Sequence, residues 1–248
     1  DQKSLDYLEL TGRSAEQIAL VESYAKAQGF WSDPQSEPRI YSKVLELDLS
    51  KVQRSVAGPS RPHDRIDLAD VKNRFSQLCN DRSLDCSKKV SVDVLGHNYE
   101  VTHGALAIAA VTSCTTATDA SMMISAGVLA RNASKAGLHP KPWVKTILAP
   151  GSRATEDILD AAGLMPALRD LGFYTCGFGC MSCIGNSGPV LPVMHDIANE
   201  IELASVLSGN RNFEGRISPD VSQNYLCAPA LVIAYSLAGT IDFDFETE

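Results

Sequence analysis

The part of the chain after residue 105 alternates apolar runs with helical patterns, and this alternation constrains the fold more than any other feature. Apolar runs begin near residues 105, 143, 173 and 203, and each leads into a loop. Helical patterns occupy 119–135, 154–171, 192–200 and 225–237. Strand, loop and helix repeated in this order are typical of parallel sheets covered by helices. We therefore predict an α/β fold with a mainly parallel sheet and helices on both faces.

The first third of the chain predicts a short helical arm. Ser14 and Gln17 form a capping box, and apolar residues then recur at helical spacing until Gly29 can end the helix. An extended connector over 30–39 follows. Three leucines at alternating positions over 45–49 are separated by acidic residues, a pattern that predicts a half-buried strand.

Two further elements lead into the alternating region. Asp67 is the expected N-cap of a helix, and a β-hairpin is expected over 90–102. We predict a division into an N-terminal arm and linking segment, 1–88, and an α/β domain, 89–248. Together they are expected to form one domain.

Composition argues against several classes of protein. The net charge of −8 disfavours broad nucleic-acid affinity, which needs a basic surface. The longest apolar run, 228–238, is much shorter than a membrane span. An odd count of seven cysteines fits a reducing compartment better than a disulfide framework. We expect a soluble protein of the cytoplasm, with the mitochondrion as the alternative.

Three cysteines stand in loops that follow apolar runs: Cys114, Cys180 and Cys183. A Cys-x-x-Cys pair alone is ambiguous between zinc, a redox dithiol and an iron–sulfur cluster. The glycine-rich surroundings of the pair favour a cluster, because glycines let backbone N–H groups approach sulfur closely. The remaining cysteines are expected to be buried or incidental thiols: Cys79, Cys86, Cys176 and Cys227.

Several ordered motifs carry a resemblance to a known family. They are Thr-Ser-Cys-Thr at 112–115, Ala-Pro-Gly-Ser at 149–152, Gly-Cys-Met-Ser-Cys-Ile-Gly-Asn at 179–186 and Ser-Gly-Asn-Arg-Asn-Phe-Glu-Gly-Arg at 208–216. With these motifs the chain resembles the aconitase superfamily over nearly its whole length. The similarity is to the cluster-binding third domain, in the branch of bacterial aconitase A and the cytosolic aconitase that doubles as an iron regulatory protein.

The resemblance implies a [4Fe-4S] cluster on Cys114, Cys180 and Cys183. In the family the fourth iron has no protein thiolate and acts as a Lewis acid on the substrate hydroxyl. The resemblance also assigns substrate binding to Asn210, Arg211 and Arg216, since a guanidinium pairs with a carboxylate through two parallel donors.

Other polar residues have simpler interpretations. Ser152 could bind an anion, but helix capping is the safer interpretation. Structural roles are expected for three histidines, His97, His103 and His195. Asn186 could support the cluster or merely pack its loop.

The chain departs from the family at one position and lacks several of its elements. Thr116 replaces an asparagine that usually follows the first cysteine motif, which affects the expected substrate. No catalytic base is recognised in this chain, so we expect the isolated chain to be inactive. The implied partners are a small tricarboxylate and the remaining aconitase domains, in cis or in trans.

The resemblance therefore implies interconversion of citrate and isocitrate through cis-aconitate. A hydratase for a citrate analogue such as 2-methylcitrate is one alternative. A cluster-free form that binds RNA is a second, which the acidic charge disfavours, and an iron–sulfur scaffold without catalysis is a third.

Overall fold

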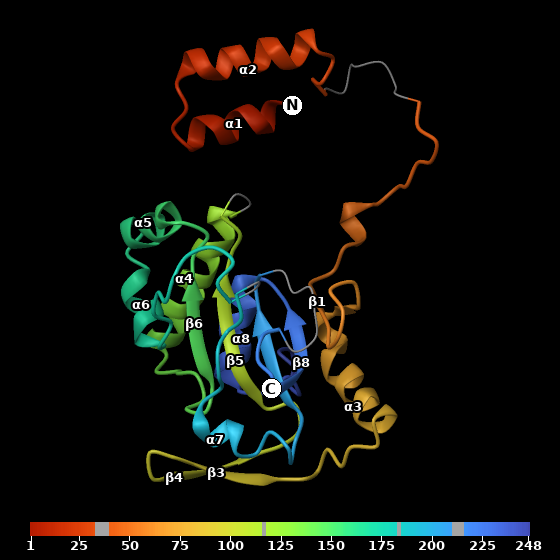
Figure 1. The fold of residues 1–248 in the computed structure, drawn as a ribbon, viewed down its shortest axis with the longest axis vertical. Coiled ribbons are helices and arrows are strands. Elements are labelled where there is room, and N and C mark those ends of the chain that lie inside the picture. The colour runs from red at the N-terminus through yellow and green to blue at the C-terminus, as the bar shows by residue number, and fades with distance from the viewer. Residues whose placement is uncertain (33–39, 116–117, 183–184, 210–215) are drawn as a thin grey trace. The chain divides into compact units, whose positions relative to one another are not determined.

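The computed structural model describes residues 1–32, 40–115, 118–182, 185–209 and 216–248. These residues form two compact units, Asp1–Lys51 and Val52–Glu248 (Figure 1). The predicted boundary between residues 88 and 89 concerns domains rather than compact units, and it stays a prediction. Within the second unit, residues 52–88 contribute two strands and a helix.

The first unit contains two helices, α1 (Gln2–Leu10) and α2 (Ala15–Ala27), which pack on each other. Ser14 caps α2 as predicted, because its side chain accepts a 3.3 Å hydrogen bond from the backbone N–H of Gln17. Helix α1 was not predicted. Its N-cap is Asp1, whose carboxylate accepts from the N–H of Ser4.

The strand predicted over 45–49 is wrong. Leu45, Leu47 and Leu49 are each at least 75% exposed, and the described residues there form only a short 3-10 helix, Leu49–Lys51. A strand needs a hydrogen-bonded neighbour, and the first unit offers none among its described residues. The alternating pattern therefore has no sheet on which to bury its apolar side.

The second unit is built on a six-stranded sheet. Its strands, in spatial order, are β2 (Arg65–Asp67), β1 (Ser55–Ala57), β8 (Val221–Leu226), β7 (Leu203–Leu207), β5 (Leu106–Thr112) and β6 (Lys145–Ala149). The four strands β8, β7, β5 and β6 are parallel, and β1 and β2 add an antiparallel edge. The predicted α/β fold with a mainly parallel sheet is confirmed. A separate hairpin, β3 (Val90–Val94) with β4 (His97–Val101), matches the predicted one.

The helices of the second unit alternate with strands along the chain and pack on the sheet. They are α3 (Val71–Asp81), which follows a 3-10 turn at Leu68–Asp70, then α4 (Ala120–Lys135), α5 (Arg153–Ala161), α6 (Met165–Asp170), α7 (Pro192–His195) and α8 (Pro229–Ala238). Helix α8 packs on β5 and β7, and α4 packs against α8, α5 and α6. In Figure 1, α7 lies below the foot of β6, beside the β3–β4 hairpin that it contacts.

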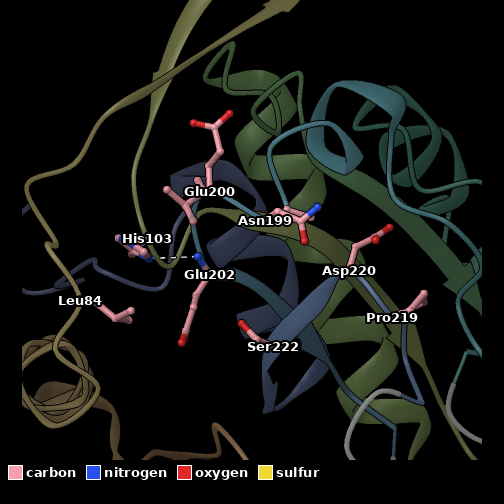
Figure 2. A pocket seen from close by; sticks show the side chains of 10 residues that line it. Leu84, His103, Asn199, Glu200, Glu202, Pro219, Asp220 and Ser222 are labelled. Atoms are coloured by element: carbon pink, nitrogen blue, oxygen red, sulfur yellow. Dashed lines mark hydrogen bonds between the residues drawn. The ribbon is translucent and has the colours of Figure 1, made fainter.

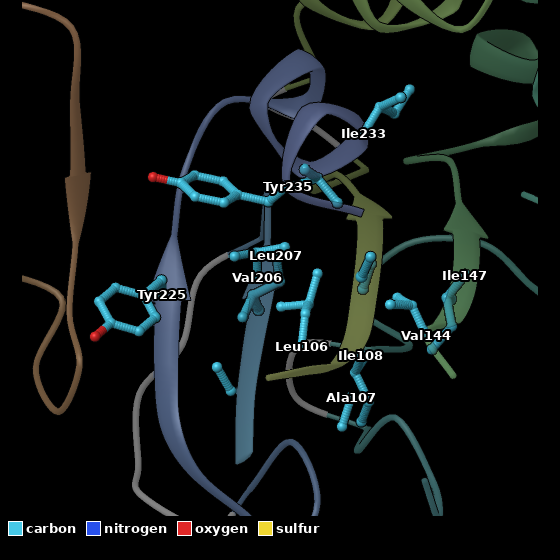
Figure 3. Packing of buried hydrophobic residues seen from close by; sticks show 14 of the residues in the cluster. Leu106, Ala107, Ile108, Val144, Ile147, Val206, Leu207, Tyr225, Ile233 and Tyr235 are labelled. Carbon is cyan, nitrogen blue, oxygen red and sulfur yellow. The ribbon is translucent and has the colours of Figure 1, made fainter. Parts of the chain in front are cut away.

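The core lies around β5. All seven residues of this strand are buried, with β6 and β7 paired along its two edges and α8 packed against it. Figure 3 shows side chains of β5, β7 and α8 in one cluster, among them Leu106, Val206 and Ile233. At about 25 cal/mol per Å² of buried apolar surface, such a strand contributes heavily to the stability of the fold.

The helix predicted over 225–237 begins later than expected. Tyr225 belongs to strand β8, and α8 starts at Pro229. Strand β8 escaped prediction because it carries buried polar residues rather than an apolar run. Asn224 accepts a 2.7 Å hydrogen bond from Ser205, and Gln223 donates a 2.8 Å bond to Glu202.

Two cysteines expected to be unpaired are joined. Cys79, in α3, forms a disulfide with Cys86, and their Cα atoms are 6.1 Å apart. The sequence pattern had pointed away from disulfides, but a separation of seven residues after a helix end lets the chain turn back on itself.

Candidate functional site

The proposed ligand loops lie at the carboxyl ends of the parallel strands. Strand β5 ends at Thr112 beside Ala149 of β6, and β7 ends at Leu207 beside Leu226 of β8. Ligands of α/β proteins collect at this edge. A cavity of about 470 Å³ opens here. Its lining comes from the segments that follow β5, β7 and β8: Thr112, Ser113, Cys114, Asp119, Met122, Met123, Ser208, Gly209, Leu226, Cys227, Ala228 and Pro229.

Two of the three predicted ligand cysteines lie next to each other. Cys114 follows β5, and Cys180 lies in the loop over 179–189, which we call the cysteine loop. Burial, together with the charge of Cys114 and a hydrogen bond to it, raises the pKa of the Cys180 thiol. The thiols of Cys114 and Cys180, which come from separate loops, therefore lie close together. Cys183, the third predicted ligand, lies outside the described residues.

Backbone contacts explain why these loops meet. The N–H of Gly179 donates a 2.7 Å hydrogen bond to the carbonyl of Pro150, and the hydroxyl of Thr112 donates to the carbonyl of Gly179 at 3.3 Å. Gly179 has a φ of +71°, a conformation that glycine adopts without strain. The cysteine loop is thus tied at its start to the ends of both β5 and β6.

The Cys114 loop is packed against a glycine. A Cβ on Gly151 would lie 1.9 Å from the Thr118 hydroxyl and 2.6 Å from the carbonyl of Cys114. Thr118 in turn donates a 2.6 Å hydrogen bond to that carbonyl. The Pro-Gly-Ser segment therefore approaches the Cys114 loop more closely than any side chain would allow.

The cysteine loop also contacts the segment that carries the predicted arginines. The side-chain amide of Asn186 donates a 2.8 Å hydrogen bond to the backbone carbonyl of Arg216, and the N–H of Ser187 donates a 2.9 Å bond to the carbonyl of Ile217. Of the predicted substrate-binding residues, Arg216 is described and half-buried, whereas Asn210 and Arg211 lie outside the described residues.

Sequence reasoning missed a lysine that holds the far end of the cysteine loop. Lys145, the first residue of β6, donates 2.7 and 2.8 Å hydrogen bonds from Nζ to the carbonyls of Ser187 and Pro189. Burial lowers the pKa of Lys145, while Cys176 nearby opposes this shift. A lysine within an apolar strand was the available signal.

The donor set fits an iron–sulfur cluster. Thiolates are the ligands that such clusters take, and Cys114 and Cys180 already lie together. The hydroxyl of Ser182, between the two loop cysteines in sequence, is buried and has no hydrogen-bond partner among the described residues. Within the same described part of the chain, no three His, Cys, Asp or Glu residues gather in a metal-binding arrangement. The third thiolate of the predicted set is Cys183.

Cys227 also lines the cavity, but it differs from the predicted ligands. It is buried, and burial strongly raises the pKa of its thiol. A thiol is a poor metal ligand until it loses its proton. Cys176, exposed, donates through Sγ to the carbonyl of Leu148.

The remaining polar candidates have structural positions. Ser152 is the N-cap residue of α5, although its side chain makes no capping hydrogen bond. His97 is exposed at the start of β4. His195 lies 3.0 Å from Asp220, which raises the pKa of the imidazole.

A second cavity, of about 290 Å³, lies at the opposite edge of the sheet (Figure 2). His103 lines it, and its Nδ1 accepts a 3.0 Å hydrogen bond from the backbone N–H of Glu202. Burial lowers the pKa of this imidazole. His103 is therefore a satisfied structural histidine, as expected.

Comparison with known proteins identifies the family. A model of the aconitase family (aconitate hydratase) matches residues 1–239. The chain belongs to the aconitase family. It is 50% identical over 263 residues to aconitate hydratase A of Thermus thermophilus, covering 100% of this chain and 29% of that protein.

Two further relatives of this aconitase-family chain carry the same name. The chain is 47% identical over 255 residues to aconitate hydratase A of Escherichia coli K12 and 45% identical over 297 residues to that of Corynebacterium diphtheriae. All of this chain is covered in both cases, but only 28% and 32% of the relatives. It thus spans about three tenths of the length of these curated relatives. Across its described parts, none of the helices is long and apolar enough to cross a bilayer.

Proposed function

We propose that this aconitase-type domain is the cluster-bearing part of a hydro-lyase that interconverts citrate and isocitrate through cis-aconitate. Cys114, Cys180 and Cys183 are the residues that would hold a [4Fe-4S] cluster. When bound, such a cluster supplies an iron without a protein thiolate, which polarises the substrate hydroxyl as a Lewis acid. The observation that carries the proposal is the contact between Cys114 and Cys180 at the carboxyl edge of the sheet.

The chain's own contribution beyond the thiols is to bind and orient the tricarboxylate. Arg211 and Arg216 pair with carboxylates through two parallel N–H donors, and Asn210 adds an amide that both donates and accepts. The carbonyl of Arg216 is hydrogen-bonded to Asn186 of the cysteine loop. This bond supports a common site for the substrate and the cluster.

We propose further that the isolated chain does not complete the reaction. The chain covers 28–32% of the relatives considered above, and its sequence offers no recognised base to abstract the substrate proton. The base would then come from another part of a longer protein, in cis or in trans. Aconitase-level turnover by the pure 248-residue chain would contradict this proposal.

Anaerobic reconstitution tests the cluster directly. The chain is incubated with iron, sulfide and reductant, and bound iron, bound sulfide and visible absorbance are measured. We expect about four iron and four sulfide per chain for a complete cluster. Cys180→Ser and Cys183→Ser should lose this content, whereas the matched control Cys176→Ser should retain it. Equal loss in the control, or full retention in both ligand variants, would refute the assignment.

The substrate is tested in the longer protein. Thr116, at the family's asparagine position, lies outside the described residues, so the choice between citrate and 2-methylcitrate rests on measurement. We expect a higher kcat/KM for citrate, and a preference for 2-methylcitrate would reassign the substrate while leaving the cluster chemistry unchanged.

A further inference from the structure

The cysteine loop runs from one edge of the sheet back toward the other. Its start is fixed by Gly179, which binds Pro150 just beyond the carboxyl end of β6. Its end is fixed by Lys145, at the beginning of the same strand. Gly179 and Pro189 are therefore held at opposite ends of β6, and Cys180 is close to only the first of these two attachments.

Lys145 is suited to hold two carbonyls at once. Its Nζ carries three N–H donors, and two of them reach Ser187 and Pro189. Lys145 is half-buried, so the two carbonyl dipoles partly replace the water that its side chain has lost. Removing this side chain would leave both carbonyls without that donor.

Asn186 uses both ends of its amide. Its Nδ2 donates to the carbonyl of Arg216, and its Oδ1 accepts from the N–H of Gly188 at 2.5 Å. Its φ of +82° lies in the left-handed region, which asparagine, aspartate and glycine tolerate better than other residues. The two hydrogen bonds have different purposes, since one closes a local turn and the other reaches a separate loop.

These contacts join the two halves of the proposed site. Cys180 and Asn186 are six positions apart in one loop, and Arg216 belongs to the segment predicted to bind substrate. A shift of the loop would therefore displace both the Cys180 thiol and the hydrogen bond from Asn186 to the backbone of Arg216. An accurate site needs such support, because a displacement of about 1 Å is enough to weaken binding or catalysis strongly.

We propose that Asn186 and Lys145 are positioning residues, which hold the cysteine loop in one orientation between the sheet and the Arg216 segment. The inference rests on the proposed function, because it assigns these residues to the support of a cluster and a tricarboxylate. Asn186 acts on the substrate-binding side through Arg216. Lys145 acts at the far end of the loop, where it fixes the carbonyls of Ser187 and Pro189.

The Asn186 bond can be tested with two substitutions that tolerate its backbone conformation. Asn186→Asp keeps the acceptor for Gly188 but loses the donor to Arg216, whereas Asn186→Gly loses both. Asn132→Asp, on the exposed surface of α4, is the matched control. In the reconstituted chain, with the cluster reduced by dithionite, citrate affinity is measured from the change in the electron paramagnetic resonance spectrum.

We expect Asn186→Asp to bind citrate about threefold or more weakly at unchanged cluster content, as the loss of one hydrogen bond implies. Citrate affinity within error of the unsubstituted chain would overturn the role of Asn186, even if thermal stability fell. If Asn186 only stabilised the fold, both variants would lose thermal stability, and citrate affinity would fall only as far as cluster content falls.

Lys145 is tested by the lifetime of the cluster in air. Lys145→Met should shorten it at least about threefold, and Lys145→Arg, which keeps donors for the carbonyls, should restore most of it. Lys135→Met, at an exposed position in α4, is the matched control. Equal lifetimes for Lys145→Met and the unsubstituted chain would overturn the role of Lys145.

Hydrogen exchange separates this inference from the proposed function. If the unsubstituted chain takes up no cluster, the proposed function fails, and amide exchange over 185–188 in the cluster-free chain decides the positioning role. We expect exchange there to accelerate about tenfold in Asn186→Gly and Lys145→Met but not in the controls. Unchanged exchange would overturn the inference as well.

Discussion

The hydroxyl of Thr118 occupies the space that a side chain on Gly151 would need. A Cβ at Gly151 would lie 1.9 Å from Thr118 Oγ1, and 2.6 Å from the carbonyl of Cys114. The first neighbour is a side-chain atom that could rotate, but the second belongs to the backbone. The position of the Cys114 loop therefore depends on the absence of a side chain in the neighbouring loop.

We predict that Gly151→Ala displaces the Cys114 loop and lowers the free energy of unfolding by about 1–3 kcal/mol, because overpacking forces the backbone to move. Chemical denaturation measures the stability, and the rate of thiol labelling at Cys114 measures the displacement. Gly163→Ala is the control, since its Cβ would meet nothing within 4 Å although its φ is +66°. The control should lose stability without a change in Cys114 labelling.

His103 predicts a loss of stability in acid. Burial holds the pKa of its imidazole below the ordinary 6.5, against the opposing effects of Glu202 and Asp85 and with the help of Lys88. The unfolded chain therefore binds a proton at a higher pH than the folded chain. The resulting stability is present above pH 6.5 and is lost as the pH falls through the folded-state pKa.

His103→Asn should flatten this part of the pH dependence, because an amide can accept from the N–H of Glu202 but does not titrate. Denaturant unfolding at pH 7.5 and pH 5.5 measures the difference. A slope as steep as in the unsubstituted chain would assign the acid sensitivity to other groups.

His195 should show the opposite sign. Hydrogen bonding to Asp220 raises the pKa of the imidazole above 6.5, so its contribution is present below that pH and is lost as the pH rises through the folded-state pKa. His195→Gln should therefore lower the free energy of unfolding most in acid, because only the protonated histidine forms an ion pair with Asp220. The effect should be small, since the His195 side chain is 66% exposed.

The disulfide between Cys79 and Cys86 should stabilise the second unit. Closing a loop of this length restricts the unfolded chain and contributes about 2 kcal/mol in the chain-entropy model. We expect dithiothreitol to lower the unfolding free energy of the unsubstituted chain by this amount. The double variant Cys79→Ala, Cys86→Ala should not respond to the reductant, and a response there would point to another bond.

Truncation tests which residues the sheet requires. Residues 52–248 contain every strand of the six-stranded sheet, whereas residues 89–248 lack β1, β2 and α3. Without them, the edge of β8 loses its neighbour and buried Phe75 no longer covers the core. We expect the longer fragment to unfold cooperatively and the shorter one to aggregate, as judged by circular dichroism and light scattering. Cooperative unfolding of both would show that residues 89–248 fold alone.

The parallel part of the fold was predictable because burial on both faces leaves an apolar run in the sequence. Strand β5 is the clearest case, with seven consecutive buried residues. Strand β8 is also an interior strand of the sheet but contains Gln223 and Asn224, whose side chains are satisfied by partners distant in sequence. Such pairing is a property of the folded sheet and leaves no local pattern.

Local patterns also misled where the tertiary partner was lacking. The alternating leucines over 45–49 have the spacing of a strand but no neighbouring strand among the described residues of their unit. Conversely, the capping box at Ser14 depends only on residues within one turn, and its prediction was confirmed. The strand over 45–49 depends on a partner distant in sequence, and its prediction was wrong.

The proximity of two thiols was predictable from the motifs, whereas the residues that hold their loops were not. Cys114 and Cys180 lie in recognisable motifs, and the structure brings them together. Cys183, Asn210 and Arg211 stay predictions. Asn186 and Lys145 bind main-chain carbonyls of other segments, and no spacing rule in the sequence reveals which carbonyl a side chain will reach.

The use of main-chain carbonyls has a consequence for how this domain can diverge. Asn186 and Lys145 recognise groups that every amino acid possesses, so replacing the side chains at positions 187, 189 or 216 does not by itself remove an attachment point. Mutations that alter substrate choice could then accumulate on a loop whose path is preserved. Asn186 and Lys145 themselves, by contrast, tolerate few substitutions, because their side chains make the hydrogen bonds. They are therefore the positions to keep fixed in any redesign of specificity.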